Sequence, residues 1–217
     1  MPGYGDWAGG IKKTLAAVEQ ERPDVAERRA HWHERLASHP VQRLVFVDES
    51  GANTKMTRLR GRALGGRRLV GRIPWGSYQT STLISGIRWD GPCAPWLFEG
   101  PMNGEMFLAW VQQGLVPVLR AGELVILDNL ATHKIRGVHE AIQARGAGLL
   151  YLPPYSPDFN PIEPMWSKIK QVLRSYAPRS DEQLLLAAQS AFQSISSADC
   201  RGFFFGAKYA TYFMEML

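Results

Sequence analysis

Short apolar runs alternate with amphipathic segments along most of this chain. The runs at 44–47, 77–89, 124–127 and 148–154 have the length and β-branched or aliphatic content of strands. The segments at 104–119, 134–146 and 165–176 space their apolar residues as helices do, and two more helical segments follow near 181–195 and 198–214. Strands that alternate with helices predict an α/β fold, and adjacent strands at the front make its sheet mixed.

The two ends of this pattern look different from its centre. Residues 11–37 are predicted to be helical, with a break at Pro23 because proline lacks a backbone N–H. We expect a peripheral helical arm at 1–40, with exposed histidines at positions 31, 33 and 39. The glycine-punctuated stretch after residue 54 predicts a hairpin that turns at Gly65 and Gly66.

The composition is that of an ordinary soluble protein. The chain has 217 residues, of which 45% are hydrophobic and 21% charged. Its apolar runs are all shorter than the roughly 18–20 residues that span a bilayer, and the first residues do not resemble a secretory signal. We therefore expect a cytoplasmic protein without a membrane partner. Cys93 and Cys200 have no metal or redox spacing, which predicts free thiols.

Positive charge is concentrated in one stretch. The net charge is +5, and residues 51–89 contain eight basic side chains and no acidic one. Such a stretch either forms a solvated face or tracks a phosphate backbone, and its one-sidedness favours the second. A further set of cations follows on the predicted helix at 165–176. The candidate DNA contacts are Lys55, Arg58, Arg60, Arg62, Arg67, Arg68, Arg72, Lys168, Lys170 and Arg174.

Two aspartates occupy equivalent places after apolar strands. Asp48 follows "LVFV" and Asp128 follows "LVIL". Ligands of open α/β sheets bind beyond the carboxyl ends of strands, so the two carboxylates meet if these strands are parallel neighbours. Adjacent carboxylates repel, and a divalent cation such as Mg²⁺ or Mn²⁺ relieves that repulsion. A lone aspartate at a strand end more often caps a turn, but the repeated pattern favours a metal site.

A third carboxylate is available at Glu163. It opens the amphipathic helix after "SPDFNP" and lies off the apolar stripe, on the side of Lys170 and Arg174. Asn160 as the N-cap would instead make Glu163 a capping-box residue. The residues alone leave capping and catalysis about equally favoured, with Asp158 as a rival acid in the same loop.

The three motifs "LVFVDESG", "LVILDNLATHK" and "LYLPPYSPDFNPIEPMWSKIK" resemble those of DDE transposases from bacterial insertion sequences, in the mariner-related branch. The similarity covers roughly residues 40–176, and 34 residues separate Asp128 from Glu163, as in that branch. The resemblance implies a ribonuclease-H-like mixed sheet flanked by helices. It also implies that Asp48, Asp128 and Glu163 bind two Mg²⁺ or Mn²⁺ ions, which decides between the two interpretations of Glu163 in favour of catalysis.

The resemblance extends to neighbouring residues and to the activity. Asn129 and His133 would line the site, and Asn160 would place the acid-bearing loop. Residues 41–180 would form the catalytic domain, with a helical extension at 181–217. The implied activity is cutting of phosphodiester bonds at element ends and joining of 3′-OH ends to target DNA, in a nucleoid-associated bacterial protein.

Several alternatives stay open. Related enzymes carry about a hundred residues of helix-turn-helix domains before the catalytic domain, whereas only a short arm precedes Asp48 here. Expected partners are therefore DNA, a second copy of the chain in a homodimer, and a separately encoded N-terminal helix-turn-helix product. The alternatives to a transposase are a ribonuclease-H-like nuclease and a non-catalytic DNA-binding or dimerisation remnant.

Overall fold

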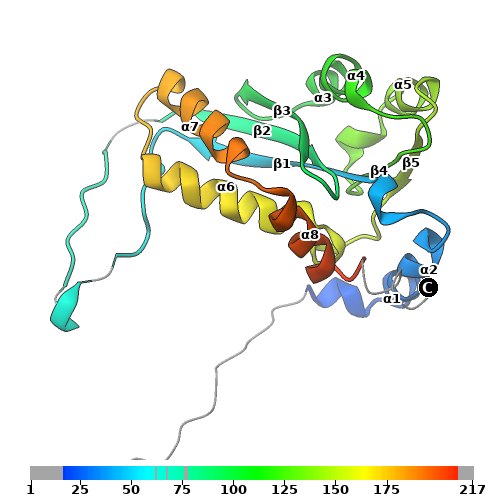
Figure 1. Ribbon diagram of the computed structural model, residues 1–217, viewed down its shortest axis with the longest axis horizontal. Helices are drawn as coiled ribbons and strands as arrows, with labels where there is room; N and C mark the ends of the chain where they lie inside the picture. The colour runs from blue at the N-terminus through cyan, green and yellow to red at the C-terminus, as the bar shows by residue number, and fades with distance from the viewer. Residues whose placement is uncertain (1–16, 62, 67, 76–77, 210–217) are drawn as a thin grey trace, which may run out of the picture.

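The computed structural model describes residues 17–61, 63–66, 68–75 and 78–209. At its centre lies a five-stranded mixed sheet with the strand order β3-β2-β1-β4-β5 (Figure 1). The strands are β1 (Leu44–Asn53), β2 (Thr80–Ile87), β3 (Pro92–Glu99), β4 (Leu124–Leu127) and β5 (Gly148–Tyr151). The predicted α/β class and mixed sheet are confirmed.

Strand β1 is the centre of the sheet and runs well beyond its apolar part. Its first residues pair in parallel with β4, from Leu44 with Leu124 to Phe46 with Ile126. Its antiparallel pairing with β2 continues from Phe46 as far as Asn53. The strand is therefore longer than the predicted 44–47, because β2 supplies partners for its polar half. Asp48 lies within β1 but at the carboxyl end of its parallel pairing.

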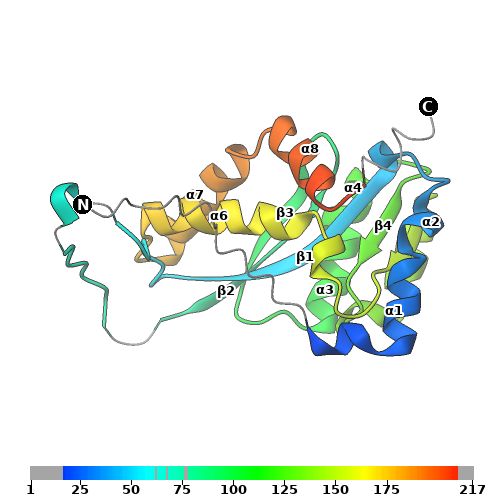
Figure 2. The same ribbon diagram turned by 90° about the horizontal axis from the view of Figure 1, so that it is seen from below.

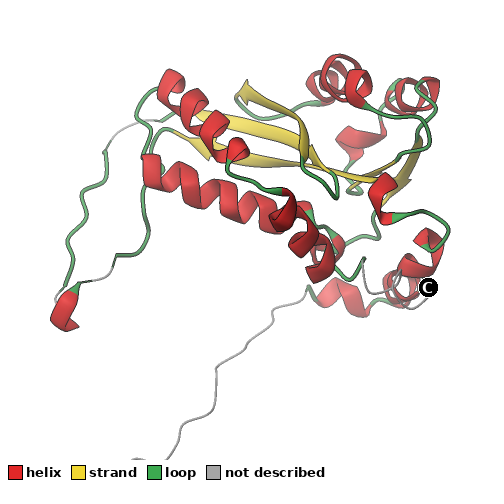
Figure 3. Ribbon diagram, viewed as in Figure 1, coloured by secondary structure: helices red, strands yellow, loops and turns green. Residues whose placement is uncertain are grey.

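Helices cover both faces of the sheet (Figure 3). Phe46 and Ile126 point into a core that is closed by α2, α6, α7 and α8, whereas Val45 and Val125 point into a second core under α3 and α5. The helices are α1 (Pro23–Ala30), α2 (Trp32–Leu36), α3 (Gly104–Trp110), α4 (Val116–Val118), α5 (Val138–Ala144), α6 (Ile162–Tyr176), α7 (Asp181–Gln193) and α8 (Ser197–Gly206). None of the helices in the described residues is long and apolar enough to cross a membrane.

The N-terminal arm is part of the first core, contrary to the prediction that it is peripheral. Trp32 and Leu36 are buried and belong to the same cluster as Phe46 and Met165. His33 is also buried, so the expectation of exposed histidines is wrong at this position. The arm was misjudged because its few apolar residues stand among charged ones, which hides a narrow buried stripe. Pro23 begins α1, as expected of a proline at the first helical position.

The basic stretch does not form the predicted hairpin. Its described residues between β1 and β2 contain no strand, only the short 3₁₀ turn Leu64–Gly66, and they extend away from the body (Figures 1 and 2). In a hairpin, the basic side chains of this stretch would face one another across the two strands without acidic partners, and such like-charge pairs disfavour strand pairing. The hairpin is formed instead by β2 and β3, with Arg88 N and Gly91 O hydrogen-bonded at its turn. Strand β3 escaped prediction because of its prolines, which an edge strand tolerates.

Candidate active site

Asp48 and Asp128 emerge side by side at the carboxyl edge of the sheet. Each lies two residues beyond the last parallel pair of β1 and β4, Phe46 with Ile126. The condition under which the two carboxylates meet, that these strands are parallel neighbours, is therefore fulfilled. Both strands are fully buried up to Val47 and Leu127, and the chain becomes partly exposed at the two aspartates. The apolar runs therefore anchor the strands and leave the acids at the surface of the core.

Glu163 reaches the same edge from the loop after β5. Leu152 N bonds to Leu127 O, which continues the pairing of β4 and β5 up to the prolines that end the strand. The chain then turns and enters α6, in which Glu163 is the second residue and is exposed. Asn160 Oδ1 accepts a hydrogen bond from Ile162 N at 3.4 Å. The Glu163 carboxylate accepts none from the described residues, so the capping-box alternative receives no support.

The three acids line one cleft of about 490 Å³. Asp48 and Asp128 line it from the edge of the sheet, and Glu163 lines it from the first turn of α6. The remaining wall comes from the turn after β4 and from the loop before α6. The other lining residues are Asn129, Leu130, Leu152, Pro153, Pro154, Tyr155, Ser156, Pro157 and Asn160. The sequence-predicted Asn129 and Asn160 thus lie in the wall of this cleft, and their roles stay predictions.

Asp48 is electrostatically crowded. Burial away from water, followed by the negative charges of Glu163 and Asp128, raises the pKa of its carboxyl group from 3.8 to about 8. The backbone N–H of Glu49, which donates to Asp48 Oδ1 at 2.8 Å, opposes this shift without cancelling it. A positive charge placed between these acids would therefore be strongly stabilised.

His133 was predicted to line the site, but it lies behind Asp128 and is not among the residues that line the cleft. Its ring is fully buried against Phe107, with 4.2 Å between the ring centroids. Nδ1 lies 2.6 Å from Asp128 Oδ1, and Nε2 lies 2.9 Å from Glu49 Oε1. Burial disfavours the charged imidazole, but the contacts with Asp128 and Glu49 raise the pKa of His133 to about 9. The imidazolium therefore makes a close charge contact with one oxygen of Asp128 from behind, although Nδ1 lacks hydrogen-bond geometry toward that oxygen.

The donor atoms that remain suit a hard divalent cation. Asp48 and Asp128 each use Oδ1 for contacts within the protein, which leaves Oδ2 of both without a hydrogen bond from the described residues. Carboxylate oxygens are the ligands that Mg²⁺ and Mn²⁺ prefer. In the part of the chain that the structure describes, no three His, Cys, Asp or Glu side chains are close enough together to hold an ion as they stand.

The raised pKa of Asp48 gives a stability prediction in metal-free buffer. Between pH 3.8 and about pH 8, Asp48 is ionised to a greater extent in the unfolded chain than in the folded chain. The free energy of unfolding should therefore fall as pH rises through this range, and level off above it. Asp48→Asn removes that contribution, so the variant should match or exceed the wild type in stability at pH 8 with EDTA present.

Denaturant melts of both chains from pH 5 to pH 8 measure this difference. The advantage of Asp48→Asn should grow with pH. A loss of more than about 2 kcal/mol at pH 8 would instead show that Asp48 is held by hydrogen bonds that asparagine cannot replace.

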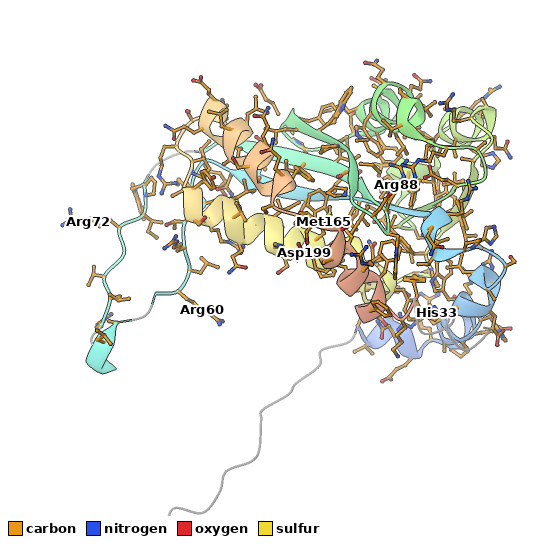
Figure 4. The ribbon with its side chains drawn as sticks, in the orientation of Figure 1. His33, Arg60, Arg72, Arg88, Met165 and Asp199 are labelled. Carbon is orange, nitrogen blue, oxygen red and sulfur yellow. The ribbon has the colours of Figure 1, made fainter. Side chains whose placement is uncertain are left out.

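The predicted DNA contacts fall into separate groups. Arg62 and Arg67 lie outside the described residues, and Lys168 forms an ion pair with Asp199 at 2.6 Å on the α8 side of α6. Lys55 lies over the Tyr78 ring, 4.8 Å from its centroid. Arg60 and Arg72 extend from the segment between β1 and β2 (Figure 4). The remaining contacts are exposed or half-buried: Arg58, Arg68, Lys170 and Arg174.

Two contributors to the site were missed from the sequence. Glu49 is the neighbour of Asp48 in β1, and successive side chains of a strand point to opposite faces. The sequence therefore gave no sign that Glu49 contacts His133, which also contacts Asp128. Arg29, in the arm, contacts Ser156 in the wall of the cleft and Asp158 in the same loop. Neither pairing has a local signal, because Glu49 and His133 are 84 positions apart in the sequence and Arg29 and Asp158 are 129 positions apart.

Comparisons with known proteins agree with this geometry. The family model described as DDE superfamily endonuclease matches residues 43–185, which include all three acids. A comparison with curated proteins found no match.

Solved structures of Mos1 mariner transposase are similar in fold. The Mos1 paired-end complex with the left transposon end has a TM-score of 0.68 at 17% identity, and the match covers 94% of this chain and 65% of that one. The paired-end complex with Mg has a TM-score of 0.69 at 17% identity, with coverages of 95% and 66%. The chain thus spans just under two thirds of the length of these proteins.

The catalytic domain of Mos1 alone matches over nearly its whole length. Its crystal structure has a TM-score of 0.64 at 15% identity, and the match covers 94% of this chain and 95% of that domain. The family match and this shared fold lead to one assignment. The chain belongs to the DDE superfamily endonucleases and has the ribonuclease-H-like fold of a mariner transposase catalytic domain.

Proposed function

We propose that this chain is the metal-dependent catalytic domain of a DNA transposase, which cuts phosphodiester bonds at element ends and joins the 3′-OH ends to target DNA. The observation that carries the proposal is that Asp48, Asp128 and Glu163 line one cleft although they come from three separate segments. The similar solved structures include complexes with a transposon end, with Mg and with Mn. These support DNA as substrate and Mg²⁺ or Mn²⁺ as cofactor.

The proposed ligands are Asp48 Oδ2, Asp128 Oδ2 and the Glu163 carboxylate, which would together hold two ions. Bound there, divalent cations supply Lewis-acid activation of a water or 3′-OH nucleophile and stabilise the leaving oxygen. The chain's own residues position these ligands. His133 holds Asp128 from behind, and the Glu49 N–H fixes one oxygen of Asp48. A cation held there would favour the ionised form of Asp48, whose pKa is raised in its absence.

Cations near the cleft offer a path for the DNA backbone. Arg58, Arg60 and Arg174 line a groove of about 750 Å³ between the basic segment and α6. Ser167 and Gln171 lie in the same groove and can donate hydrogen bonds to phosphate oxygens. Because Glu163 begins α6, a strand lying in this groove would run along the helix from the acids. Lys168 is left out of this path because it is paired with Asp199.

Salt dependence tests this path. Each phosphate contact adds about 0.9 to the slope of log affinity against log salt concentration. The double variant Arg58→Ala with Arg60→Ala should therefore bind duplex DNA more weakly, and its slope should be shallower by about 2. Fluorescence anisotropy in sodium chloride from about 50 to 200 mM measures both quantities.

Arg201→Ala is the matched control, because Arg201 is exposed on α8 and does not line the groove. Its slope should equal that of the wild type. If the double variant also keeps the wild-type slope, the DNA follows another route.

The proposed activity is tested with pre-cut duplexes that carry the ends of the DNA element encoding this chain, incubated with target plasmid and Mg²⁺ or Mn²⁺. Covalent joining of the 3′ ends to the plasmid is the expected result. Cleavage of an RNA–DNA hybrid without joining would favour a ribonuclease-H-like nuclease. Binding of DNA without any metal-dependent product would favour a non-catalytic remnant.

A further inference from the structure

The N-terminal arm grips the loop that forms one wall of the cleft. Arg29 Nη1 donates to Ser156 Oγ at 2.7 Å and to Asp158 Oδ1 at 2.9 Å, and Nη2 donates to Asp158 Oδ2 at 2.7 Å. The guanidinium also lies 4.4 Å from the centroid of the Phe159 ring. Only 16% of the Arg29 side chain is exposed. One side chain of α1 therefore contacts four residues of the loop, three of them (Tyr155, Ser156 and Asp158) through hydrogen bonds.

The gripped loop contains a strained residue. Tyr155 has φ of +56°, in the left-handed region that residues other than glycine seldom adopt. Its carbonyl oxygen accepts hydrogen bonds from Gln20 Nε2 at 2.6 Å and from Arg29 Nη1 at 3.4 Å. Strained conformations persist where surrounding contacts over-determine them. Here the contacts come from the arm, and Tyr155 lines the cleft.

A second set of contacts fixes the end of the loop next to α6. Tyr209 donates its hydroxyl to Phe159 O at 2.5 Å, and Trp32 Nε1 donates to the Tyr209 hydroxyl at 2.8 Å. The His33 ring packs edge-on against Phe159, with 5.0 Å between the centroids. His33 lies where the arm meets the body (Figure 4). The next residue after Phe159 is Asn160, whose carbonyl accepts from Glu163 N.

This loop connects two of the three acids. It begins after β5, which pairs with the strand just before Asp128, and it ends at α6, in which Glu163 is the second residue. Its conformation therefore sets how far Glu163 lies from the aspartates. In Figure 2, α1 lies beside the loop, on the side of the molecule away from α7. Contacts between Arg29 and this loop can therefore affect the geometry of the acids although Arg29 does not contact the acids themselves.

We propose that Arg29 is a positioning residue: it holds the loop at 155–159 in its strained form and thereby places Glu163 for joint metal binding with Asp48 and Asp128. The part concerning metal rests on the proposed function. The arm is then a component of the active site and not only a covering of the core.

Arg29→Ala tests the proposal through two readouts that do not need catalysis. Hydrogen exchange of the amides at 155–160 should become about tenfold faster or more, because the loop loses its anchor. Calorimetric titration with Mn²⁺ should show affinity reduced about 10- to 100-fold, the usual range for loss of a group that orients metal ligands. Arg29→Lys should resemble Arg29→Ala, because one ammonium group cannot replace the forked contacts of a guanidinium.

Two controls make the result specific. Arg28→Ala removes an exposed arginine from the same helix and should leave both readouts unchanged. Ile142→Val weakens the second core under α5 and should lower overall stability without faster exchange in the loop. Circular dichroism confirms that each variant is folded at the temperature of the assay.

The possible outcomes separate this proposal from the proposed function. If the wild type binds no Mn²⁺, the proposed function fails, and loop exchange alone decides whether Arg29 holds the loop. If the wild type binds Mn²⁺ but Arg29→Ala matches Arg28→Ala in either exchange or affinity, the positioning role is overturned.

Discussion

Asp128→Asn should reduce DNA cleavage and strand transfer at least about a thousandfold, because metal-ion catalysis contributes several kcal/mol to the barrier and each 1.36 kcal/mol is a tenfold change in rate. The substitution keeps the shape of the side chain but removes the charge that faces the cleft. Asp128 also lies 2.6 Å from His133 Nδ1, so the buried imidazolium would keep Glu49 as its only carboxylate contact among the described residues. The loss should appear in the rate with bound substrate more than in DNA affinity.

Single-turnover assays with saturating enzyme and Mg²⁺ measure this effect. Asp90→Asn is the matched control, because Asp90 is an exposed aspartate in the β2–β3 turn, and it should retain full activity. Both variants should be assayed well below their unfolding temperatures, since Asp128→Asn also removes a charge contact. Activity within tenfold of the wild type would show that Asp128 does not hold the catalytic ion.

Glu123→Ala should destabilise the chain by about 3–5 kcal/mol, the cost of leaving one member of a buried ion pair without its partner. Arg88 Nε lies 2.7 Å from Glu123 Oε1, and Nη2 donates to Oε2 at 3.0 Å. The two side chains are only 7% and 1% exposed. Glu123 Oε2 also accepts from Arg120 N, and Arg88 Nη2 donates to Val118 O, so the pair ties the end of β2 to the turn before β4.

Thermal and urea unfolding check this expectation, with a fall in Tm of about 10 °C for a chain of this size. Arg120→Ala is the control, because the Arg120 side chain is exposed and lies 4.0 Å from Asp90. Exposed pairs contribute little, so this variant should stay within about 0.5 kcal/mol of the wild type. A loss below about 1 kcal/mol in Glu123→Ala would mean that water reaches Arg88 when its partner is removed.

The elements predicted well are those whose pattern is local. The apolar run at Leu124–Leu127 lies between Glu123 and Asp128, and its predicted bounds are those of β4 in the structure. Gly146 has φ of +75° just after α5, as expected of a glycine that ends a helix. Most of the apolar stripe of α6 is buried between Ile162 and Leu173, whereas Val172 is half-buried and the terminal Tyr176 is exposed. In each case, spacing within one element determines which side faces the core.

The candidate site was predictable only in part. The repeated pattern before Asp48 and Asp128 favoured a metal site, but whether the two strands are neighbours was left as a condition that only the fold could decide. Glu163 could not be decided from local sequence, because a glutamate at a helix start suits capping and catalysis alike. The resemblance to DDE transposases favoured catalysis, and the cleft agrees with that choice. The roles of Glu49 and Arg29 depend on contacts between distant segments, which no periodicity encodes.

The segment between β1 and β2 shows a third kind of limit. Its glycines and alternating residues favoured a hairpin by local rules, yet Arg58, Arg60 and Arg72 are exposed and no strand forms around them in the described residues. Pairing energy between strands comes from cross-strand neighbours, and like charges remove it. Arg88 was counted with the same basic stretch but is buried with Glu123. Charge alone therefore did not separate a surface cation from a structural one.

The most direct test of this account is a crystal structure of the chain grown with Mn²⁺ and examined by anomalous scattering. We predict that Asp48, Asp128 and Glu163 draw together around Mn²⁺, with carboxylate oxygens from all three acids in its coordination sphere or in those of two adjacent ions. Anomalous density that touches the aspartates while Glu163 stays turned to solvent, or no density in the cleft at saturating Mn²⁺, would contradict it.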